Sequence, residues 1–304
     1  MIKKIPIIID TDIGDDIDDA FALCLAMQCP EFEILGVTTV FKNTRLRAML
    51  AQRLLRLGGR EDIPVAMGAS IPLANPEMFG KKLDFDERPL TFSEEFMEEL
   101  KEKRHAVDFI IDVLEQSKEP ITIVTLGALT NIADVLRRRP DLKNKIQQLN
   151  VMGGAYDMNW TEYNYACDPE AADFVIQSGI LIKAIGIDVT LKCRLGQDRL
   201  QALQSNGHPC IQMLMKMCSK WMMNGEVCLH DPLALWTAFD ESVVHFEREA
   251  FCVEHQAHYS RGICIRLSDH NWKKPAECVN FYVAKTVDSE RFITGCINRL
   301  NLFS

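Results

Sequence analysis

Six aspartates lie within ten residues near the start of the chain, between Asp10 and Asp19. Carboxylates this close together repel one another, and the repulsion can be offset by water, by the positive end of a following helix or by a bound cation. Ligands that are all oxygens suit a hard ion, Ca²⁺ or Mg²⁺. The segment therefore predicts a metal site, with a solvated acidic loop that caps a helix as the alternative.

The residues on either side of the aspartates place them at a turn from a strand to a helix. Residues 5–9 are short, apolar and rich in β-branched side chains, which favours a buried strand. Residues 20–27 are mostly apolar and are soon followed by Pro30, which favours a helix that ends before the proline. In open α/β sheets such turns lie at the carboxyl edge of the strands, where ligands bind. We therefore expect the aspartates to face a ligand.

Polar residues follow other predicted strands and are expected at the same edge of the sheet. Glu162 and Asn164 flank Tyr163, and alternation in an extended segment places both polar side chains on one side. His230 and Asp231 precede an apolar helical pattern, so the simplest interpretation of Asp231 is a helix cap. The histidine adds a group that titrates near neutral pH.

The composition is that of an ordinary globular protein without a surface for nucleic acid. Of the 304 residues, 47% are hydrophobic and 25% are charged, and the length permits one or two domains. The formal net charge is -9, and no stretch gathers enough Lys and Arg to neutralise a run of phosphates. The basic residues in 45–60 and 137–139 are interpreted as solvated faces of helices.

The cysteines and the apolar segments indicate a cytoplasmic protein. The chain has 11 cysteines with no C-x-x-C pair, which is typical of reduced thiols in a core. No apolar run reaches the length of a membrane span. Because the first predicted strand begins directly after Lys4, we expect no targeting segment.

Strands and helices are predicted to alternate along the chain. The predicted strands are 33–40, 63–67, 121–126, 145–152 and 181–188. The predicted helices are 44–57, 93–116 with a break near Arg104, 131–139, one that opens at Asp168, and several within 198–239. Residues 69–89 are expected to form a long surface loop that covers a site, and 251–254 and 262–267 to form antiparallel edge strands. We predict one α/β domain over residues 1–304, with a Rossmann-like, open, mostly parallel sheet flanked by helices.

Six short motifs occur along the chain in a fixed order. They are D-x-D-x-G with a later D-D-A between Asp10 and Ala20, Thr38-Thr39-Val40 with Asn43, Gly127 to Ala133, Met152-Gly153-Gly154, Glu162-Tyr163-Asn164 with Asp168 to Ala172, and His230 to Ala234. Each motif alone is weak, but the whole order resembles the inosine-uridine-type nucleoside hydrolases, which cleave the N-glycosidic bond of ribonucleosides. Residues 287–292 near the end also resemble this family.

The resemblance implies a calcium site and a mechanism. One Ca²⁺ would be held by Asp12, Asp19, Asp231 and the backbone carbonyl of Leu126. Asp12 would take a proton from a water made more acidic by the ion, and His230 would protonate, or hydrogen-bond to, the departing base. The residues that would hold the ribose are Asp18, Asn43, Met152, Asn159, Glu162 and Asn164. A ring of carboxylates suits the positive charge that develops on the ribose.

Three departures from the family pattern change details of this site. The aspartate loop is two residues longer than the commonest form, so Asp15 or Asp16 could replace Asp18. Lys42 stands where a Gly often precedes the Asn. The loop after Met67 lacks the His that some members place over the base, and Phe79-Gly80 stands there instead. The preference for purine or pyrimidine therefore stays open.

The resemblance also implies a partner and a role. The partner is a small-molecule nucleoside, and the assembly is a homodimer or homotetramer. The role is either nucleoside salvage or a more specialised one, such as the use of a modified nucleoside.

Three other functions are weighed against this one. A phosphatase of the haloacid dehalogenase type would use Asp10 as nucleophile and Asp12 as acid and base, but its motif usually has Thr or Val where this chain has Gly14. It also leaves Glu162 and His230 unexplained. A non-enzymatic calcium module fails the EF-hand spacing, because Gly14 is the fifth residue of the loop instead of the sixth. The last alternative is an inactive relative that only binds nucleosides.

Overall fold

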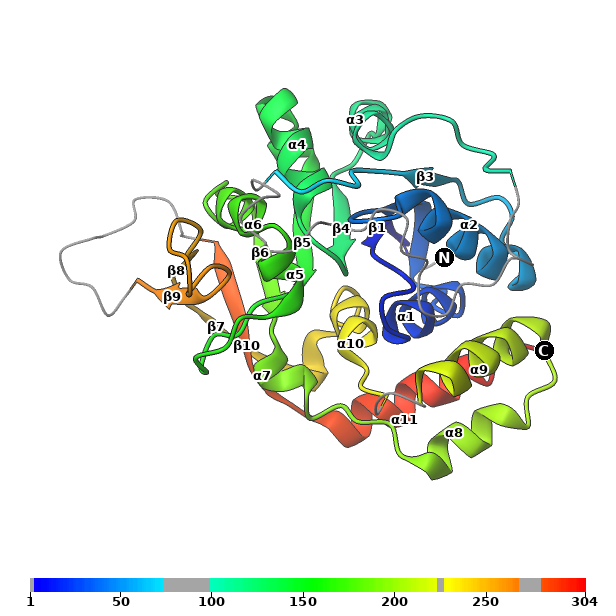
Figure 1. Ribbon diagram of the computed structural model, residues 1–304. Helices are drawn as coiled ribbons and strands as arrows, with labels where there is room; N and C mark the ends of the chain where they lie inside the picture. Colours follow the sequence, from blue (N-terminus) through cyan, green and yellow to red (C-terminus); the bar gives the residue numbers. More distant parts are fainter. Residues whose placement is uncertain (1–2, 74–98, 223–226, 268–279) are drawn as a thin grey trace.

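A computed structural model describes residues 3–73, 99–222, 227–267 and 280–304. Its centre is an eight-stranded sheet in the order β3-β2-β1-β4-β5-β6-β10-β7, in which every pair is parallel except β10 with β7 (Figure 1). The strands are β1 (Ile5–Thr11), β2 (Phe32–Thr39), β3 (Val65–Met67), β4 (Ile121–Thr125), β5 (Ile146–Met152), β6 (Ile182–Ile185), β7 (Val244–Arg248) and β10 (Phe281–Val287). The strand order reverses between β1 and β4, and ligands bind at such a reversal in open α/β sheets.

The isoleucines of β1 show why this strand is central. Successive side chains of a strand point to opposite faces, and both faces of a parallel sheet are buried. Accordingly Ile7 and Ile9 pack into the core on one face and Ile8 packs into the core on the other. The strand pairs with β2 on one side and β4 on the other, so no edge is left open.

Helices cover both faces of the sheet (Figure 1). The core of the first face draws on α1 (Asp18–Met27), α2 (Thr44–Leu57), α8 (Gln197–Gln204), α9 (Pro209–Trp221), α10 (His230–Trp236) and α11 (Ser289–Leu300). The core of the second face draws on α3 (Ala106–Gln116), α4 (Thr130–Arg138) and α6 (Pro169–Ile176). Two short helices, α5 (Tyr163–Cys167) and α7 (Ile187–Thr190), follow β5 and β6, and 3-10 helices occupy Pro140–Lys145 and Glu241–Val243. Within the described ranges, no helix is long and apolar enough to cross a membrane.

The predicted single α/β fold is confirmed, but the C-terminal part of the chain differs from the prediction. The predicted edge strands 251–254 and 262–267 form β8 (Phe251–Val253) and β9 (Cys264–Arg266), a separate two-stranded antiparallel sheet. One edge of the main sheet is β7, which pairs with β10, and the sequence pattern predicted neither strand. The strand predicted at 181–188 ends at Ile185, because the chain turns into α7 there.

Two predictions fall partly outside the described residues. These are the loop 69–89, of which 69–73 are described, and the start of the helix 93–116. The described helix in that region is α3, which begins at Ala106 after the predicted break.

Candidate active site

The aspartate segment runs from the end of β1 into α1, as predicted. Asp12 follows the last residue of β1, while Asp18 and Asp19 are the first two residues of α1, where the positive end of the helix favours carboxylates. Gly127 lies just after β4, where the backbone passes close to the side chain of Asp12. A Cβ at Gly127 would lie 2.9 Å from Oδ1 of Asp12, so any other residue would require this carboxylate to shift.

The segment opens into a cavity of about 730 Å³ at the carboxyl ends of β1 and β4. The cavity has an acidic part and an apolar, partly aromatic part. The acidic and polar lining consists of Asp12, Asp15, Asp16, Asp18, Asp19, Lys42, Glu162, Asn164, His230 and Asp231. The remaining lining consists of Leu126, Met152, Met158, Trp160, Tyr163, Ile187, Leu191 and Trp221.

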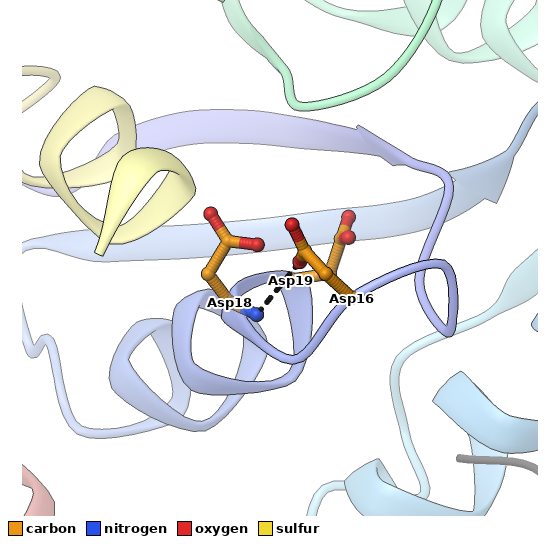
Figure 2. A group of neighbouring side chains, drawn as sticks. All are labelled: Asp16, Asp18 and Asp19. Carbon is orange, nitrogen blue, oxygen red and sulfur yellow. Dashed lines mark hydrogen bonds between the residues drawn. The ribbon is translucent and has the colours of Figure 1, made fainter. Parts of the chain in front are cut away.

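Three carboxylates form the tightest group in this acidic part. Asp16, Asp18 and Asp19 each offer an oxygen within 4.8 Å of the others, and Figure 2 shows them side by side at the start of α1. Asp16 Oδ1 accepts the backbone N–H of Asp18 at 3.1 Å. Asp18 Oδ2 accepts the backbone N–H of Asp231 at 3.0 Å, and Asp19 accepts the hydroxyl of Thr11. The first turn of α10 is thereby joined to the first turn of α1.

Asp231 does not cap α10, contrary to the simplest interpretation of the sequence. The residue before this helix is Leu229, which makes no side-chain capping bond, and Asp231 is the second residue of the helix. The side chain of Asp231 is buried and faces the same cavity as the aspartate segment. Asp18 supplies the acceptor for the helix N-terminus instead.

Burial disfavours the charged form of these carboxyls. It raises the pKa of Asp18 to about 6 and that of Asp19 to about 7, and it raises the pKa values of Asp12 and Asp231 well above the usual range. Repulsion among the carboxylates adds to the effect of burial. A cation at this place would favour the charged carboxylates and so offset both the burial and the repulsion. The buried, all-oxygen donor set therefore fits a hard divalent ion.

Arg47 is a buried cation beside the segment, and sequence reasoning missed it. The side chain of Arg47 is 1% exposed. Its guanidinium donates to the carbonyl of Phe41 at 2.8 Å, to the carbonyls of Asp12 and Ile13, and to Oδ1 of Asp15 at 2.7 Å. The prediction that the basic residues of 45–60 form a solvated face is thus wrong at this position. The only sequence signal is the helical spacing that places Arg47 on the apolar face of α2.

Asp15 links three side chains at the mouth of the cavity. Besides Arg47, it accepts the phenol of Tyr163 at 2.6 Å, and its Oδ2 lies 3.9 Å from Nζ of Lys42. Lys42 and Phe41 both have positive φ, at 56° and 67°. Left-handed backbone is unfavourable for these residue types, and the bond from Arg47 to the Phe41 carbonyl helps hold it. Asp15, which belongs to the lengthened aspartate loop, is thus held in the lining of the cavity.

Glu162 and Asn164 meet at the cavity, but not in the way predicted. Glu162 is the N-cap of α5 and Asn164 lies within that helix, so the segment is not extended. The Glu162 carboxylate accepts the backbone N–H groups of Gly154, Asn164 and Tyr165 at 2.7–3.0 Å. Burial raises the pKa of Glu162, and these bonds oppose the rise.

The amide of Asn164 joins the ends of two strands. Its Nδ2 donates to the carbonyl of Leu126 at 2.7 Å and to that of Met152 at 3.1 Å. Leu126 lines the cavity, and the bond from Asn164 uses one of the two lone-pair positions of its carbonyl.

His230 lies at the side of the cavity as the first residue of α10. Burial lowers the pKa of this half-buried imidazole, and the nearby Asp16 carboxylate opposes that effect. Its Nδ1 lies 2.6 Å from the hydroxyl of Thr190.

Two predicted ribose ligands are not among the described residues that line the cavity. Asn43 caps α2, and its side-chain oxygen accepts the N–H of Leu46 at 3.2 Å. Asn159 is exposed, between the lining residues Met158 and Trp160.

Asp10 is also outside the cavity. It is fully buried, its Oδ1 accepts from Thr38 at 2.5 Å and Asn131 at 2.8 Å, and burial raises its pKa to about 7. Asp10 thus joins β1 to β2 and α4.

The α/β fold has a cavity at the reversal of its strand order, lined by carboxylates, a histidine and apolar residues, which is the usual place and make-up of a ligand site. A family model described as "Inosine-uridine preferring nucleoside hydrolase" matches residues 7–294. The chain belongs to this family, whose members are N-glycosidases that hydrolyse ribonucleosides.

Curated and solved relatives agree with this assignment over nearly the whole chain. The pyrimidine-specific ribonucleoside hydrolase RihA of Citrobacter koseri is 33% identical over 282 residues, which cover 86% of this chain and 88% of that protein. The solved plant nucleoside hydrolase PpNRh1 is 27% identical with a TM-score of 0.83, covering 98% of this chain and 99% of that one. The purine-preferring ribonucleoside hydrolase from Gardnerella vaginalis is 27% identical with a TM-score of 0.81, covering 97% and 98%.

Proposed function

We propose that this enzyme is a Ca²⁺-dependent hydrolase that cleaves the N-glycosidic bond of ribonucleosides to ribose and free base. One observation carries the proposal. Seven carboxylates line one cavity, whereas Lys42 is the one lysine or arginine in its described lining and the buried Arg47 adjoins it. A divalent ion supplies the charge that this group lacks.

Four groups would hold the ion: the carboxylates of Asp12, Asp19 and Asp231 and the carbonyl of Leu126. All four belong to residues that line the cavity. Asp16 and Asp18 lie beside them and are available to the ion or to the ribose. When bound, Ca²⁺ makes a coordinated water more acidic.

The carboxylates of the chain then act on water and sugar. Asp12 takes a proton from the attacking water as general base. Asp16, Asp18 and Glu162 lie around the position of the ribose, where negative charge stabilises an oxocarbenium-like transition state. Since Glu162 is fixed by three backbone N–H groups, it offers its charge without having to reorient.

The neutral groups are proposed to orient the ribose hydroxyls. Asn164 is fixed by its two carbonyl partners, and Met152 forms the wall beside it. Asn43 uses its oxygen in the helix cap, so its NH₂ group is the part available to a hydroxyl. Asn159 would reach the sugar from the rim of the cavity.

His230 is proposed to protonate the departing base. The apolar wall that includes Trp160 and Trp221 suits the flat face of a nucleobase. The names of the relatives include both pyrimidine-specific and purine-preferring enzymes, so the preferred base must be ranked by assay.

We further propose that the enzyme assembles as a homodimer or homotetramer. Its proposed role is nucleoside salvage in the cytoplasm. The assembly is tested by sedimentation of the purified protein.

The phosphatase alternative requires Asp10 as nucleophile, and the position of this residue argues against it. Asp10 lies outside the cavity and is bound to Thr38 and Asn131. The deciding assay offers the purified enzyme a panel of purine and pyrimidine ribonucleosides and, separately, p-nitrophenyl phosphate. We expect ribose and free base from at least one nucleoside and no phosphate release. Phosphate release without nucleoside cleavage would favour the phosphatase, and binding without cleavage would favour the inactive relative.

A further inference from the structure

Four charged side chains form a closed network beside the cavity, here called the charge ring: Asp157, Glu249, Arg266 and Lys285. Asp157 accepts two bonds from Nζ of Lys285, at 2.8 and 2.9 Å, and one from the guanidinium of Arg266. Glu249 pairs with the same two cations, at 2.8 Å from Lys285 and 3.0 Å from Arg266. Carboxylates and cations therefore alternate around the ring. Such a network holds its members better than an isolated surface pair does.

Three members of the charge ring come from the C-terminal part of the fold. Lys285 belongs to β10 of the main sheet, Arg266 belongs to β9, and Glu249 lies between β7 and β8. Asp157 follows β5, 109 positions before Arg266 and 128 positions before Lys285. The ring thus joins a segment from the middle of the chain to both sheets.

Asp157 stands at the start of the cavity rim. Met158 follows it directly, and Met158 and Trp160 both line the cavity. These two side chains are 40% and 62% exposed, so burial alone does not hold them in place. The carboxylate of Asp188 accepts the backbone N–H groups of Tyr156 at 2.8 Å and Asp157 at 3.0 Å. Polar contacts therefore fix the point from which the rim extends.

The carboxylate of Asp157 is charged at neutral pH. Burial raises the pKa of Asp157, but the bonds from Lys285 and Arg266 outweigh burial and keep this pKa below its usual value. Bonds between charged partners are about twice as strong as bonds between neutral ones. An asparagine at this position would keep the shape of the side chain, but it would lose the charge and one of the two acceptor oxygens.

We propose that Asp157 is a positioning residue for binding of the base: through the charge ring it holds Met158 and Trp160 at the edge of the apolar wall. This inference rests on the proposed function, in which that wall receives the base. A rim that is already in place lowers the cost of ordering side chains when the substrate binds. Loss of the ring therefore weakens nucleoside binding and leaves the bond-breaking step nearly unchanged.

The test compares Asp157→Asn with the matched control Asp141→Asn. Asp141 also accepts two bonds from one arginine, Arg139, at 2.9 and 2.7 Å, but it does not line the cavity or adjoin its rim. We expect Asp157→Asn to raise KM for the best nucleoside by roughly 3- to 10-fold and to change kcat by less than about twofold. Asp141→Asn should change neither. An unchanged KM in Asp157→Asn, a loss confined to kcat, or the same rise in both variants would overturn the proposal.

A double-mutant cycle tests whether the effect passes through the charge ring. Lys285→Met removes the cation that donates twice to Asp157, and it should raise KM as Asp157→Asn does. Because the two residues act through one network, the double variant should have a KM no higher than that of the more affected single variant. Rises in KM that multiply in the double variant would show that Asp157 acts without the ring.

Hydrogen exchange followed by mass spectrometry gives a readout without substrate. We expect the backbone amides of residues 156–161 to exchange faster in Asp157→Asn than in the wild type, because the rim then opens more often. Asp141→Asn should leave these amides unchanged, and β5 should stay equally protected in all three proteins. Unchanged exchange at the rim of Asp157→Asn, or faster exchange over the whole chain, would overturn the positioning role. A wild type that cleaves no nucleoside would instead overturn the proposed function, and hydrogen exchange would then decide alone whether Asp157 holds the rim.

Discussion

Replacing Arg47 with methionine should destabilise the protein far more than any change on the exposed face of the same helix. Arg47→Met keeps a long side chain but removes the buried charge. It leaves the carbonyls of Phe41, Asp12 and Ile13 and one oxygen of Asp15 without their donor. Removing one partner of a buried ion pair costs about 3–5 kcal/mol. Since native proteins are stable by only about 5–15 kcal/mol, this is a large part of the total.

The matched control is Arg45→Met, two residues earlier in α2, where the side chain is exposed. Surface substitutions of this kind usually change stability by about 0.5 kcal/mol or less. The assay is urea unfolding of the wild type and both variants at a fixed calcium concentration, because bound calcium itself stabilises the folded state. The transition midpoint of Arg47→Met should be much lower, with a similar slope. If Arg47→Met costs no more than Arg45→Met, Arg47 is not the cation that balances the aspartate segment.

Three further outcomes are expected. Asp12→Ala should lower kcat by more than about 10³-fold while the protein stays folded by circular dichroism, because it removes the proposed base and an ion ligand together; unchanged turnover would rule out that assignment. His230→Ala should slow natural nucleosides most and p-nitrophenyl riboside least, and equal losses would remove His230 from the acid role. Glu31 and Arg299 pair through two bonds of 2.7 Å, and Arg299 lowers the pKa of Glu31 below 4.5. A lowered folded-state pKa stabilises the protein above pH 4.5, and the effect disappears as the pH falls through the lowered value. Glu31→Gln should therefore cost at most about 1 kcal/mol at pH 7, given the exposure of the pair, and nothing in acid; a loss that persists in acid would contradict this reasoning.

Local sequence patterns were sufficient to predict the parallel sheet and the turn that contains the aspartates. An apolar β-branched run followed by aspartates and a helical pattern has few other folded solutions, and β1, Asp12 and α1 lie as predicted. The strands near the end of the chain were harder to predict from the sequence. β10 is paired with β6 and β7 across long sequence separations, and its alternation of apolar and polar residues is weak, so nothing local marked it.

The supporting residues of the site were missed for a different reason. The helical spacing in α2 places Arg47 on the apolar face, but the reason for its burial is apparent only when the carbonyls around it are seen. Thr190 contacts His230 across 40 positions, and a threonine in a helical turn gives no functional signal by itself. Glu162 was expected in an extended segment, but its carboxylate caps α5, and capping was not considered for it. The contacts of Arg47 and Thr190 are tertiary contacts, which a pattern along the chain does not contain, whereas the Glu162 cap is a local contact.

The most direct test of the account is ribose release measured against bound calcium in the same samples. Enzyme is stripped with a chelator and titrated with Ca²⁺, and the bound metal per chain is determined by mass spectrometry alongside release of reducing sugar from the best nucleoside. We expect no turnover in the stripped enzyme and activity that rises in proportion to bound calcium, up to one ion per chain. Full activity of the stripped enzyme, or a bound calcium that leaves the rate unchanged, would contradict the central claim that the buried carboxylates act together with a metal ion.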